Sequence, residues 1–346
     1  MKRYKVITFF ALFLFGITSW VGYKLYKDTF GNIANQTTYV FIPKGSNIAD
    51  VIDILDDSGL ITNKELFLFL AKQKKFDENR VIGGRYEIYP NTNLNALIDQ
   101  LKIGDTCPIT VKLKKFDSLE AVATTISKHL EITKEEFLTA FTDSNFILAS
   151  GFTPETFPAI FIPGDYEFFW EWNAESLRNK FVDQYHIFWN EKRLKKAKRL
   201  NLSPIEVHTL ASIVNKETYL TSELSTIAGL YYNRIRKKMY LQSDPTIIYT
   251  IHQKEPNRKI RRVLYRDLKI DSPYNTYLNK GLPPGPISYP KPSVIDATLN
   301  LERHNYIFMC AQSNLGGTHA FAETAEEHEL NANSYREALD SLRVRR

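Results

Sequence analysis

The N-terminal segment constrains this chain most, because it is long and apolar enough to cross a membrane. Lys2, Arg3 and Lys5 precede eighteen residues, Val6 to Tyr23, that carry no charge. This length is close to the minimum for a helix that spans the hydrocarbon core of a bilayer. Trp20 lies near the far end of the segment, where amphipathic aromatic rings favour the membrane interface.

A cleaved signal peptide is the competing interpretation of this segment. Its core would be unusually long and bulky, and Thr18-Ser19-Trp20 is a poor cleavage site. We therefore expect residues 1–27 to form a short cytoplasmic stub and an uncleaved transmembrane anchor. Because positive residues stay on the cytoplasmic side, the chain after residue 27 is expected to lie in the periplasm or another extracytoplasmic space.

The remaining sequence is long enough for two or three globular domains. Its only cysteines, Cys107 and Cys310, lie far apart, and a disulfide between them is the less favoured alternative. No spacing of Cys and His indicates a metal site, and no motif indicates nucleic-acid binding. The net charge is +6, with basic runs at residues 193–199 and 259–262. Such runs are typical of solvated helix faces, and they also suit an anionic polymer or anionic lipid headgroups.

A loose internal repeat follows the linker at residues 28–38. Each copy has a strand, an apolar helix face, a second helix start and a closing strand. The offset is 71 residues from Ile48 to Leu119 and from Thr62 to Thr133, and 80 residues from Gly84 to Gly164. A constant offset over two elements predicts two βααβ units, at residues 38–105 and 106–173. We expect Thr62 and Thr133 to act as helix N-caps.

A βααβ unit has the size of a LysM-like module, which binds N-acetylated glycans along a helix–strand groove. A purely structural platform for the C-terminal region is the alternative. After these units, aromatic residues at helical spacing predict one long amphipathic helix over residues 174–200, whose aromatic face is expected to be core.

The next predicted helix carries an acidic residue on its packed face. Ser203-Pro204-Ile205-Glu206 has a capping box and a proline at the first helical position. At 100° per residue, Glu217 lies about 20° around the helix from Leu210, which belongs to the apolar face. An acid on that face loses hydration, so its pKa rises and it stays protonated and able to donate. From this helix alone, a structural Glu paired with a nearby Lys or Arg is the favoured alternative.

Three polar, turn-rich segments follow, at residues 241–246, 272–277 and 281–287. They also contain Tyr, Leu and Ile, and loops of this kind often line clefts. The prolines of the third segment restrict φ and predict a stiff wall. Asp244 before Pro245 is typical of a helix start, with Asp244 as the N-cap, although a capping Asp can also face a cleft.

These segments resemble the endolytic murein transglycosylase (YceG-like) family over roughly residues 160–340, and more weakly over the repeats and the anchor. The resemblance rests on four ordered motifs: Leu210-Ala-Ser-Ile-Val-Asn-Lys-Glu217-Thr, Leu241-Gln-Ser-Asp-Pro-Thr, Tyr274-Asn-Thr-Tyr and Gly281-Leu-Pro-Pro-Gly-Pro-Ile. It implies a single-pass inner-membrane enzyme with LysM-like modules and a periplasmic catalytic domain. It implies that Glu217 is the catalytic acid, and it places Gln242, Asp244, Tyr274 and Asn275 on or near the glycan cleft.

Two positions depart from the family pattern. The family often has Glu two residues before the catalytic one, and this chain has Asn215, which leaves Glu217 as the only carboxylate of the motif. The family's Gly-Gly-His-Thr-Phe appears as Gly316-Gly-Thr-His319-Ala-Phe, so the histidine is shifted by one position. We interpret His319 as a strand-edge or turn residue.

The predicted fold is therefore α+β: an N-terminal transmembrane helix, two LysM-like βααβ units and a mixed α/β catalytic domain at residues 174–346. Within that domain we expect a hairpin from residues 305–310 and 318–321, and a closing helix at 324–343.

The resemblance implies cleavage of the β-1,4 bond between N-acetylmuramic acid and N-acetylglucosamine in nascent peptidoglycan. The sugar's own C6 hydroxyl closes a 1,6-anhydro end, which limits strand length. One Glu can serve as acid and then as base, so no cofactor is expected. The expected partners are glycan strands, the inner membrane and wall synthases. Two alternatives remain: a hydrolytic muramidase that uses Asp244 to activate water, and a non-catalytic peptidoglycan-binding scaffold for synthases.

Overall fold

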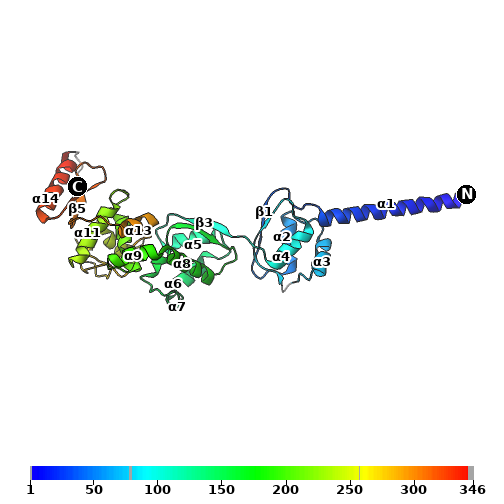
Figure 1. Ribbon diagram of the computed structural model, residues 1–346, viewed down its shortest axis with the longest axis horizontal. Helices are drawn as coiled ribbons and strands as arrows, with labels where there is room; N and C mark the ends of the chain where they lie inside the picture. The colour runs from blue at the N-terminus through cyan, green and yellow to red at the C-terminus, as the bar shows by residue number, and fades with distance from the viewer. Residues whose placement is uncertain (1, 78–79, 257, 342–346) are drawn as a thin grey trace. The chain divides into compact units, whose positions relative to one another are not determined.

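The computed structural model describes residues 2–77, 80–256 and 258–341, and it shows a mixed α/β chain that begins with a long apolar helix, α1 (Lys2–Phe30) (Figure 1). Among the described residues, α1 is the one helix long and apolar enough to cross a membrane, over Ile7–Phe30. Its large apolar side chains are exposed, with Phe15 at 70%. Within the described chain no protein surface buries the apolar window of this helix, which is the pattern that a bilayer-embedded segment requires.

The chain divides into two compact units. The first contains Met1–Val111, Ile126–Thr133 and Tyr166–Asn173, and the second contains Lys112–Thr125, Lys134–Asp165 and Ala174–Arg346. The division passes through the second predicted βααβ segment, so the predicted boundaries at residues 105 and 173 stay predictions.

The first βααβ segment has a two-stranded antiparallel sheet, in which Thr38 pairs with Ile88 and Ile42 with Gly84. Alternate residues of both strands face a core, with Val40, Ile42, Tyr86 and Ile88 at 2% exposure or less. A helix at residues 94–103, which the repeat did not predict, adds further apolar residues to this core. The elements are β1 (Thr38–Ile42), α2 (Ile48–Asp57), α3 (Lys64–Gln73), β2 (Gly84–Ile88) and α4 (Leu94–Ile103).

Asparagine side chains begin the helices of this segment. Asn47 and Asp50 form a reciprocal capping box at the start of α2. Asn63, one residue after the expected Thr62, caps α3 by accepting a hydrogen bond from the Leu66 amide at 2.9 Å. The expectation for Thr62 is therefore wrong, because an Asn carbonyl at the next position makes the same bond.

The second βααβ segment repeats the strand pairing, since β3 and β4 form another two-stranded sheet. An additional short helix and a 3₁₀ turn occupy the insertion before its closing strand. The elements are β3 (Ile109–Leu113), α5 (Leu119–Ser127), α6 (Lys134–Thr142), α7 (Ser144–Leu148), the 3₁₀ helix η2 (Phe157–Ile160) and β4 (Gly164–Phe168).

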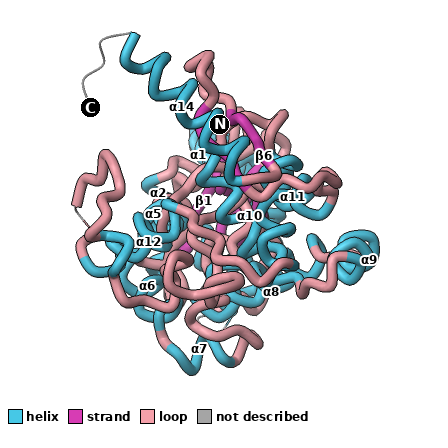
Figure 2. Tube along the Cα trace, turned by 90° about the vertical axis from the view of Figure 1, so that its left-hand side faces the viewer, coloured by secondary structure: helices cyan, strands magenta, loops and turns pink. Residues whose placement is uncertain are grey.

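The rest of the second unit is mostly helical. Figure 2 shows, for the whole chain, how far the helices in cyan outweigh the strands in magenta. The predicted hairpin is confirmed as an antiparallel pair in which Phe308 lies opposite Ala322 and Ala311 opposite His319. The elements are α8 (Ala174–Phe188), α9 (Glu191–Arg199), α10 (Pro204–Glu217), α11 (Leu224–Arg236), α12 (Asp244–Lys254), the 3₁₀ helix η3 (Asp267–Lys269), α13 (Pro292–Leu299), β5 (Phe308–Ala311), β6 (His319–Ala322) and α14 (Ala325–Ser341).

The long helix predicted over residues 174–200 is broken in two. Asn190 leaves the helical conformation and its side chain accepts a hydrogen bond from the Arg193 amide at 3.1 Å, which begins α9. Asn competes with helical backbone bonding in this way at N-caps. The aromatic face is core as expected, since Phe181 and Tyr185 are buried.

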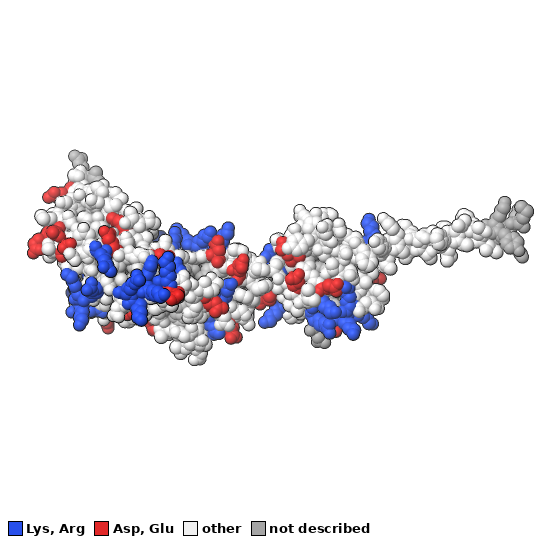
Figure 3. All heavy atoms as spheres, viewed as in Figure 1, with Lys and Arg blue, Asp and Glu red and all other residues white. Residues whose placement is uncertain are grey.

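Clustered phenyl rings form part of the core of the second unit. Phe137 and Phe141 stack with ring centroids 3.9 Å apart, and Phe141, Phe161 and Phe181 meet at 4.9–6.1 Å. The basic residues of α9 lie on its other side and contribute to a dense patch of Lys and Arg in Figure 3. Some of this charge is paired, because Arg193 binds Asp296 at 2.8 Å.

Candidate functional site

Helix α10 begins as the sequence predicts. The Ser203 hydroxyl accepts a hydrogen bond from the Glu206 amide at 3.2 Å, and the Glu206 carboxylate accepts one from the Ser203 amide at 2.7 Å. Pro204 occupies the first helical turn. All eight residues from Val207 to Val214 are buried, and the helix ends at Glu217.

Glu217 is partly exposed at the end of this buried helix, and two hydroxyl groups bind one of its oxygens. The hydroxyls of Tyr231 and Ser243 donate to Glu217 Oε1 at 2.5 and 2.6 Å. Both donors belong to other parts of the unit and are themselves buried, at 2% and 1% exposure. Within the described part of the chain, Glu217 Oε2 has no hydrogen-bond partner.

The environment keeps the Glu217 carboxyl protonated to higher pH than an ordinary Glu. Loss of hydration on burial is the main cause of its raised pKa, and the negative charge of Asp244 raises it further. The hydrogen bonds from Ser243 and Tyr231 and the charge of His319 act in the opposite direction. The direction of this shift is the one that the helix periodicity predicted.

Ser243 reaches Glu217 because its hydroxyl does not cap the helix that follows it. Ser243 occupies the N-cap position of α12, yet its side chain makes no capping hydrogen bond. Its backbone amide donates to Thr276 Oγ1 at 3.1 Å, which fixes its position. The expected role of Asp244 as the N-cap is therefore wrong, since Asp244 is the first residue of α12.

Asp244 instead has an exposed carboxylate that accepts a hydrogen bond from the Tyr277 hydroxyl at 2.7 Å. The charge of Asp244 contributes to the raised pKa of Glu217, so the two carboxyls lie within electrostatic range. This arrangement joins the first and second turn-rich segments beside Glu217.

Gln242 lies next to this site in a left-handed conformation, with φ at 51°. The backbone amide of Gln242 donates to the Thr276 carbonyl at 3.1 Å. The side-chain oxygen of Gln242 accepts a hydrogen bond from the Arg234 guanidinium at 3.3 Å. The side chain is exposed. A contact between Gln242 and a glycan stays a prediction.

Tyr274 and Asn275 are buried in the second segment. Tyr274 packs against Tyr249 with ring centroids 4.8 Å apart. The Asn275 amide donates to the carbonyls of Leu268 and Ile270 at 3.0 and 2.7 Å, and its oxygen accepts from the Tyr277 amide at 2.9 Å. In this structure Asn275 holds the loop in shape, and the predicted contact of either residue with a glycan remains untested.

The third, proline-rich segment is tied to α10 one turn before Glu217. The Ile287 amide donates to Ser212 Oγ at 2.9 Å, and the Asn215 amide donates to Ser288 Oγ at 3.2 Å. Gly285 is required here, because a Cβ atom would lie 1.8 Å from the Glu155 carbonyl oxygen. Asn215 thus serves to hold this loop.

A buried arginine connects α11 to the segments on either side of the site. Arg234 donates to the carbonyls of Ile307, Tyr240 and Leu241 at 2.5, 3.2 and 2.8 Å, as well as to Gln242. Burial lowers its pKa from the usual value. These bonds satisfy the guanidinium and fix the backbone that leads to Ser243.

Sequence reasoning missed several residues that shape this site. Ser243 and Tyr277 belong to motifs that it singled out, so their polar side chains could have been included. Tyr231 and Arg234 had no local signal, because they lie on an ordinary amphipathic helix. His319 begins β6 as expected for a strand-edge residue, and its ring is hydrogen-bonded to Glu223, which the sequence did not single out.

The structure also bears on metals and thiols. Across residues 2–77, 80–256 and 258–341, no three His, Cys, Asp or Glu side chains are grouped so that they could hold a metal ion. Cys107 and Cys310 are both free thiols.

Comparisons with known proteins agree on one family. The model of the YceG-like family matches residues 40–334. An endolytic murein transglycosylase of Bacillus subtilis (strain 168) is 29% identical over 87% of this chain and 86% of its own length. A protein of the same name from Streptococcus pneumoniae (strain ATCC BAA-255 / R6) is 28% identical over 94% of this chain, which spans 64% of that relative. A crystal structure of a putative YceG-like protein from Listeria monocytogenes matches with a TM-score of 0.54 and 28% identity, covering 86% of this chain and 99% of the other.

Proposed function

Because the chain belongs to the YceG-like family, we propose that it is an endolytic murein transglycosylase whose catalytic acid is Glu217. The observation that carries this proposal is a carboxyl of raised pKa at a helix end, bound through one oxygen by two buried hydroxyls. Relatives that carry the name endolytic murein transglycosylase match most of the chain. The substrate is then the β-1,4-linked glycan of peptidoglycan.

The two hydrogen bonds on Oε1 assign different tasks to the two oxygens of Glu217. Oε2 is left to carry the proton, and it donates that proton to the glycosidic oxygen as the bond to C1 breaks. The carboxylate that forms keeps the donors Tyr231 and Ser243 on Oε1, so its charge is stabilised without rearrangement of the site.

One carboxyl group can complete the reaction. The 2-acetamido group of the sugar assists at C1, and the C6 hydroxyl of the same sugar then attacks C1. Its proton passes to the Glu217 carboxylate, which restores the acid. The bond to the leaving oxygen is replaced by the 1,6-anhydro bond, and no water is consumed. The products are a 1,6-anhydro end and a new non-reducing end, and such internal cuts limit strand length.

Mass spectrometry of the fragments released from purified glycan tests this reaction directly. A transglycosylase leaves 1,6-anhydro ends, which are lighter by one water than the reducing ends left by a hydrolase. The hydrolytic alternative also has a candidate base, because Asp244 is exposed and lies within electrostatic range of Glu217. Reducing ends alone would contradict the transglycosylase proposal and support the muramidase.

The hydrogen bonds to Glu217 predict a shift in the pH profile. The Tyr231 hydroxyl stabilises the carboxylate and lowers the Glu217 pKa, so Tyr231→Phe should raise this pKa. Since the acid must be protonated, the alkaline limb of the kcat profile should move to higher pH. The maximal rate should fall about tenfold, because a hydrogen bond to the developing charge is lost. Ser243→Ala should act in the same direction.

Tyr232→Phe is the matched control for this measurement. Tyr232 is the next residue of α11, and its hydroxyl donates to the Leu200 carbonyl at 2.9 Å instead of to Glu217. The control should keep the wild-type pH limb. An unchanged limb in both Tyr231→Phe and Ser243→Ala would show that Glu217 is not the titrating acid.

We extend the proposal to the N-terminal half of the chain. Helix α1 serves as a single-pass anchor of the inner (plasma) membrane, with its N-terminus in the cytoplasm and the catalytic region outside it. The βααβ units are LysM-like and bind glycan. Fractionation of the full-length protein and protease accessibility in intact spheroplasts test the anchor and its orientation. Loss of binding to insoluble peptidoglycan on deletion of residues 38–105 tests the second role, and unchanged binding would leave these units as a platform.

A further inference from the structure

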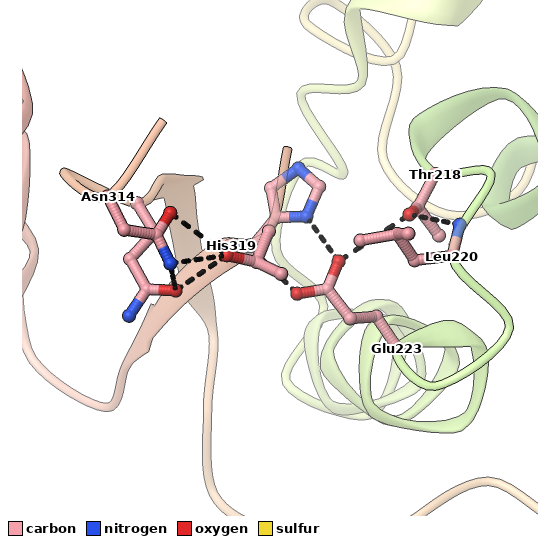
Figure 4. Close-up of polar contacts among 7 residues, drawn as sticks. Thr218, Leu220, Glu223, Asn314 and His319 are labelled. Atoms are coloured by element: carbon pink, nitrogen blue, oxygen red, sulfur yellow. Dashed lines mark hydrogen bonds and ion pairs between the residues drawn. The ribbon is translucent and has the colours of Figure 1, made fainter. Parts of the chain in front are cut away.

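Near Glu217, a histidine and a buried carboxylate form a pair that the proposed reaction does not use. Glu223 is 8% exposed, and both of its oxygens accept hydrogen bonds from His319. The His319 backbone amide donates to Oε1 at 2.8 Å, and Nδ1 of the ring binds Oε2 at 2.9 Å (Figure 4). Two bonds to one residue fix both the backbone and the ring orientation of His319.

This pairing defines which ring nitrogen is available. The carboxylate of Glu223 can only accept, so the bonded Nδ1 of His319 carries a hydrogen. The other nitrogen, Nε2, points away from Glu223 in Figure 4. Within the described residues Nε2 has no hydrogen-bond partner, and the His319 side chain is 17% exposed. A ring held in this way presents Nε2 as a hydrogen-bond acceptor whenever that nitrogen carries no proton.

The pair lies beside the catalytic carboxyl. Glu223 precedes α11 and belongs to the short turn that begins directly after Glu217, where Thr218 Oγ1 accepts from the Leu220 amide at 3.0 Å. The charge of His319 also acts on Glu217, which places the ring within electrostatic range of it. The hairpin β5–β6 therefore brings one ring nitrogen without a partner among the described residues into the neighbourhood of Glu217.

We propose that His319 is a glycan-binding residue beside Glu217, with its ring held by Glu223 so that Nε2 accepts a hydrogen bond from a hydroxyl or acetamido N–H of the sugar chain. In this role Glu223 is a positioning residue. The inference rests on the proposed function, because it takes peptidoglycan glycan as the ligand. The competing explanation is structural: the pair could do no more than attach the hairpin to the α10–α11 turn.

Two substitutions of His319 separate these explanations, because each retains one half of the ring's hydrogen bonding. His319→Asn places an amide N–H near the position of Nδ1, so it keeps the bond to Glu223 and lacks the Nε2 position. His319→Gln places its amide near Nε2 and lacks the bond to Glu223. A structural role predicts that Asn is tolerated and Gln is not, whereas a glycan-binding role predicts the reverse for binding.

Binding is measured with the full-length protein in detergent, in the Glu217→Gln background, so that the glycan stays intact. The probe is purified uncrosslinked glycan strands. We expect His319→Asn to weaken binding about tenfold while the thermal midpoint stays near that of the parent. We expect His319→Gln to lower the thermal midpoint and to bind more tightly than His319→Asn. His252→Gln, on an exposed part of α12, should leave both quantities unchanged.

The outcomes distinguish failure of this inference from failure of the proposed function. Parent-like binding by His319→Asn would overturn the inference and leave the proposed function intact. A second outcome is that wild-type protein releases no fragments, while His319→Gln still binds glycan more tightly than His319→Asn. The glycan-binding role is then supported and the proposed cleavage is overturned. If the parent itself binds no glycan strands, the inference is overturned, and the proposed function falls with it only if the wild-type protein also releases no fragments. In the Glu217-intact enzyme, a selective rise in KM for His319→Asn, with kcat little changed, would further support the binding role.

Discussion

Glu217→Gln is expected to lower the rate of glycan cleavage by roughly 10²–10⁴-fold, which is the usual contribution of general acid–base catalysis. Gln retains the carbonyl oxygen that accepts from Tyr231 and Ser243, so the local hydrogen bonds and the fold should persist. The amide cannot donate a proton to a leaving oxygen as a carboxylic acid does. Release of soluble fragments from purified glycan, followed by chromatography, measures the effect.

Glu326→Gln serves as a control for this substitution, because Glu326 is exposed in the first turn of α14. Both variants should have the thermal midpoint of the wild-type protein. Near-normal cleavage by a folded Glu217→Gln protein would reject Glu217 as the acid. Rescue by Glu217→Gln of a strain that lacks this protein would instead favour the non-catalytic scaffold.

His208 predicts a second large effect, on stability at low pH. Its side chain is fully buried in α10, and within the described residues neither ring nitrogen has a hydrogen-bond partner. Burial lowers its pKa to about 3. In the unfolded chain a histidine binds a proton near its ordinary pKa of about 6.5. The folded state therefore loses stability as the pH falls below about 6.5, by roughly 2–3 kcal/mol at about pH 4.5.

His208→Leu should remove this part of the pH dependence, because Leu is of similar size and cannot bind a proton. Urea unfolding of wild type and variant at about pH 7 and about pH 4.5 measures it. Between these two pH values we expect the free energy of unfolding to fall by roughly 2–3 kcal/mol less in His208→Leu than in the wild type. His252→Leu controls for loss of an exposed histidine. Equal acid sensitivity of wild type and His208→Leu would show that the His208 ring is protonated in the folded state.

Helices and strands were predicted well where a short stretch of sequence is enough to specify where the element begins or pairs. The capping box of Ser203 and Glu206 defined the start of α10, and the hairpin expected from residues 305–310 and 318–321 appears as β5 and β6. The errors at Thr62 and Asn190 have one cause, because several neighbouring polar residues can cap a helix and the sequence does not rank them. Helix α4 follows the closing strand of the first predicted unit and carried no motif.

The candidate site was only half predictable. Periodicity placed Glu217 on a buried face, and the turn-rich motifs indicated the segments around it. Tyr231 could not be found in this way, because it lies on an ordinary amphipathic helix and reaches Glu217 only through helix packing. The contact of Ser243 with Glu217 could not be predicted, because Ser243 is an N-cap residue. The hydroxyl of such a residue normally accepts a hydrogen bond from the backbone of the helix that follows. The binding role predicted for Asn275 stays a prediction, and the structure adds that its side-chain amide donates to two backbone carbonyls.

The sequence by itself determined the long apolar N-terminal helix, the strand pairs of the repeat and of the hairpin, the family and the acidic residue at the end of α10. Each of these depends on the character of residues that are close in the chain, such as apolar spacing, capping and turn chemistry. The tertiary structure alone decided how Glu217 is hydrated, which of its oxygens is free, and that Glu223 orients His319. Hydration, hydrogen bonding and pKa depend on atoms brought together from distant segments, and residue spacing does not specify those distances.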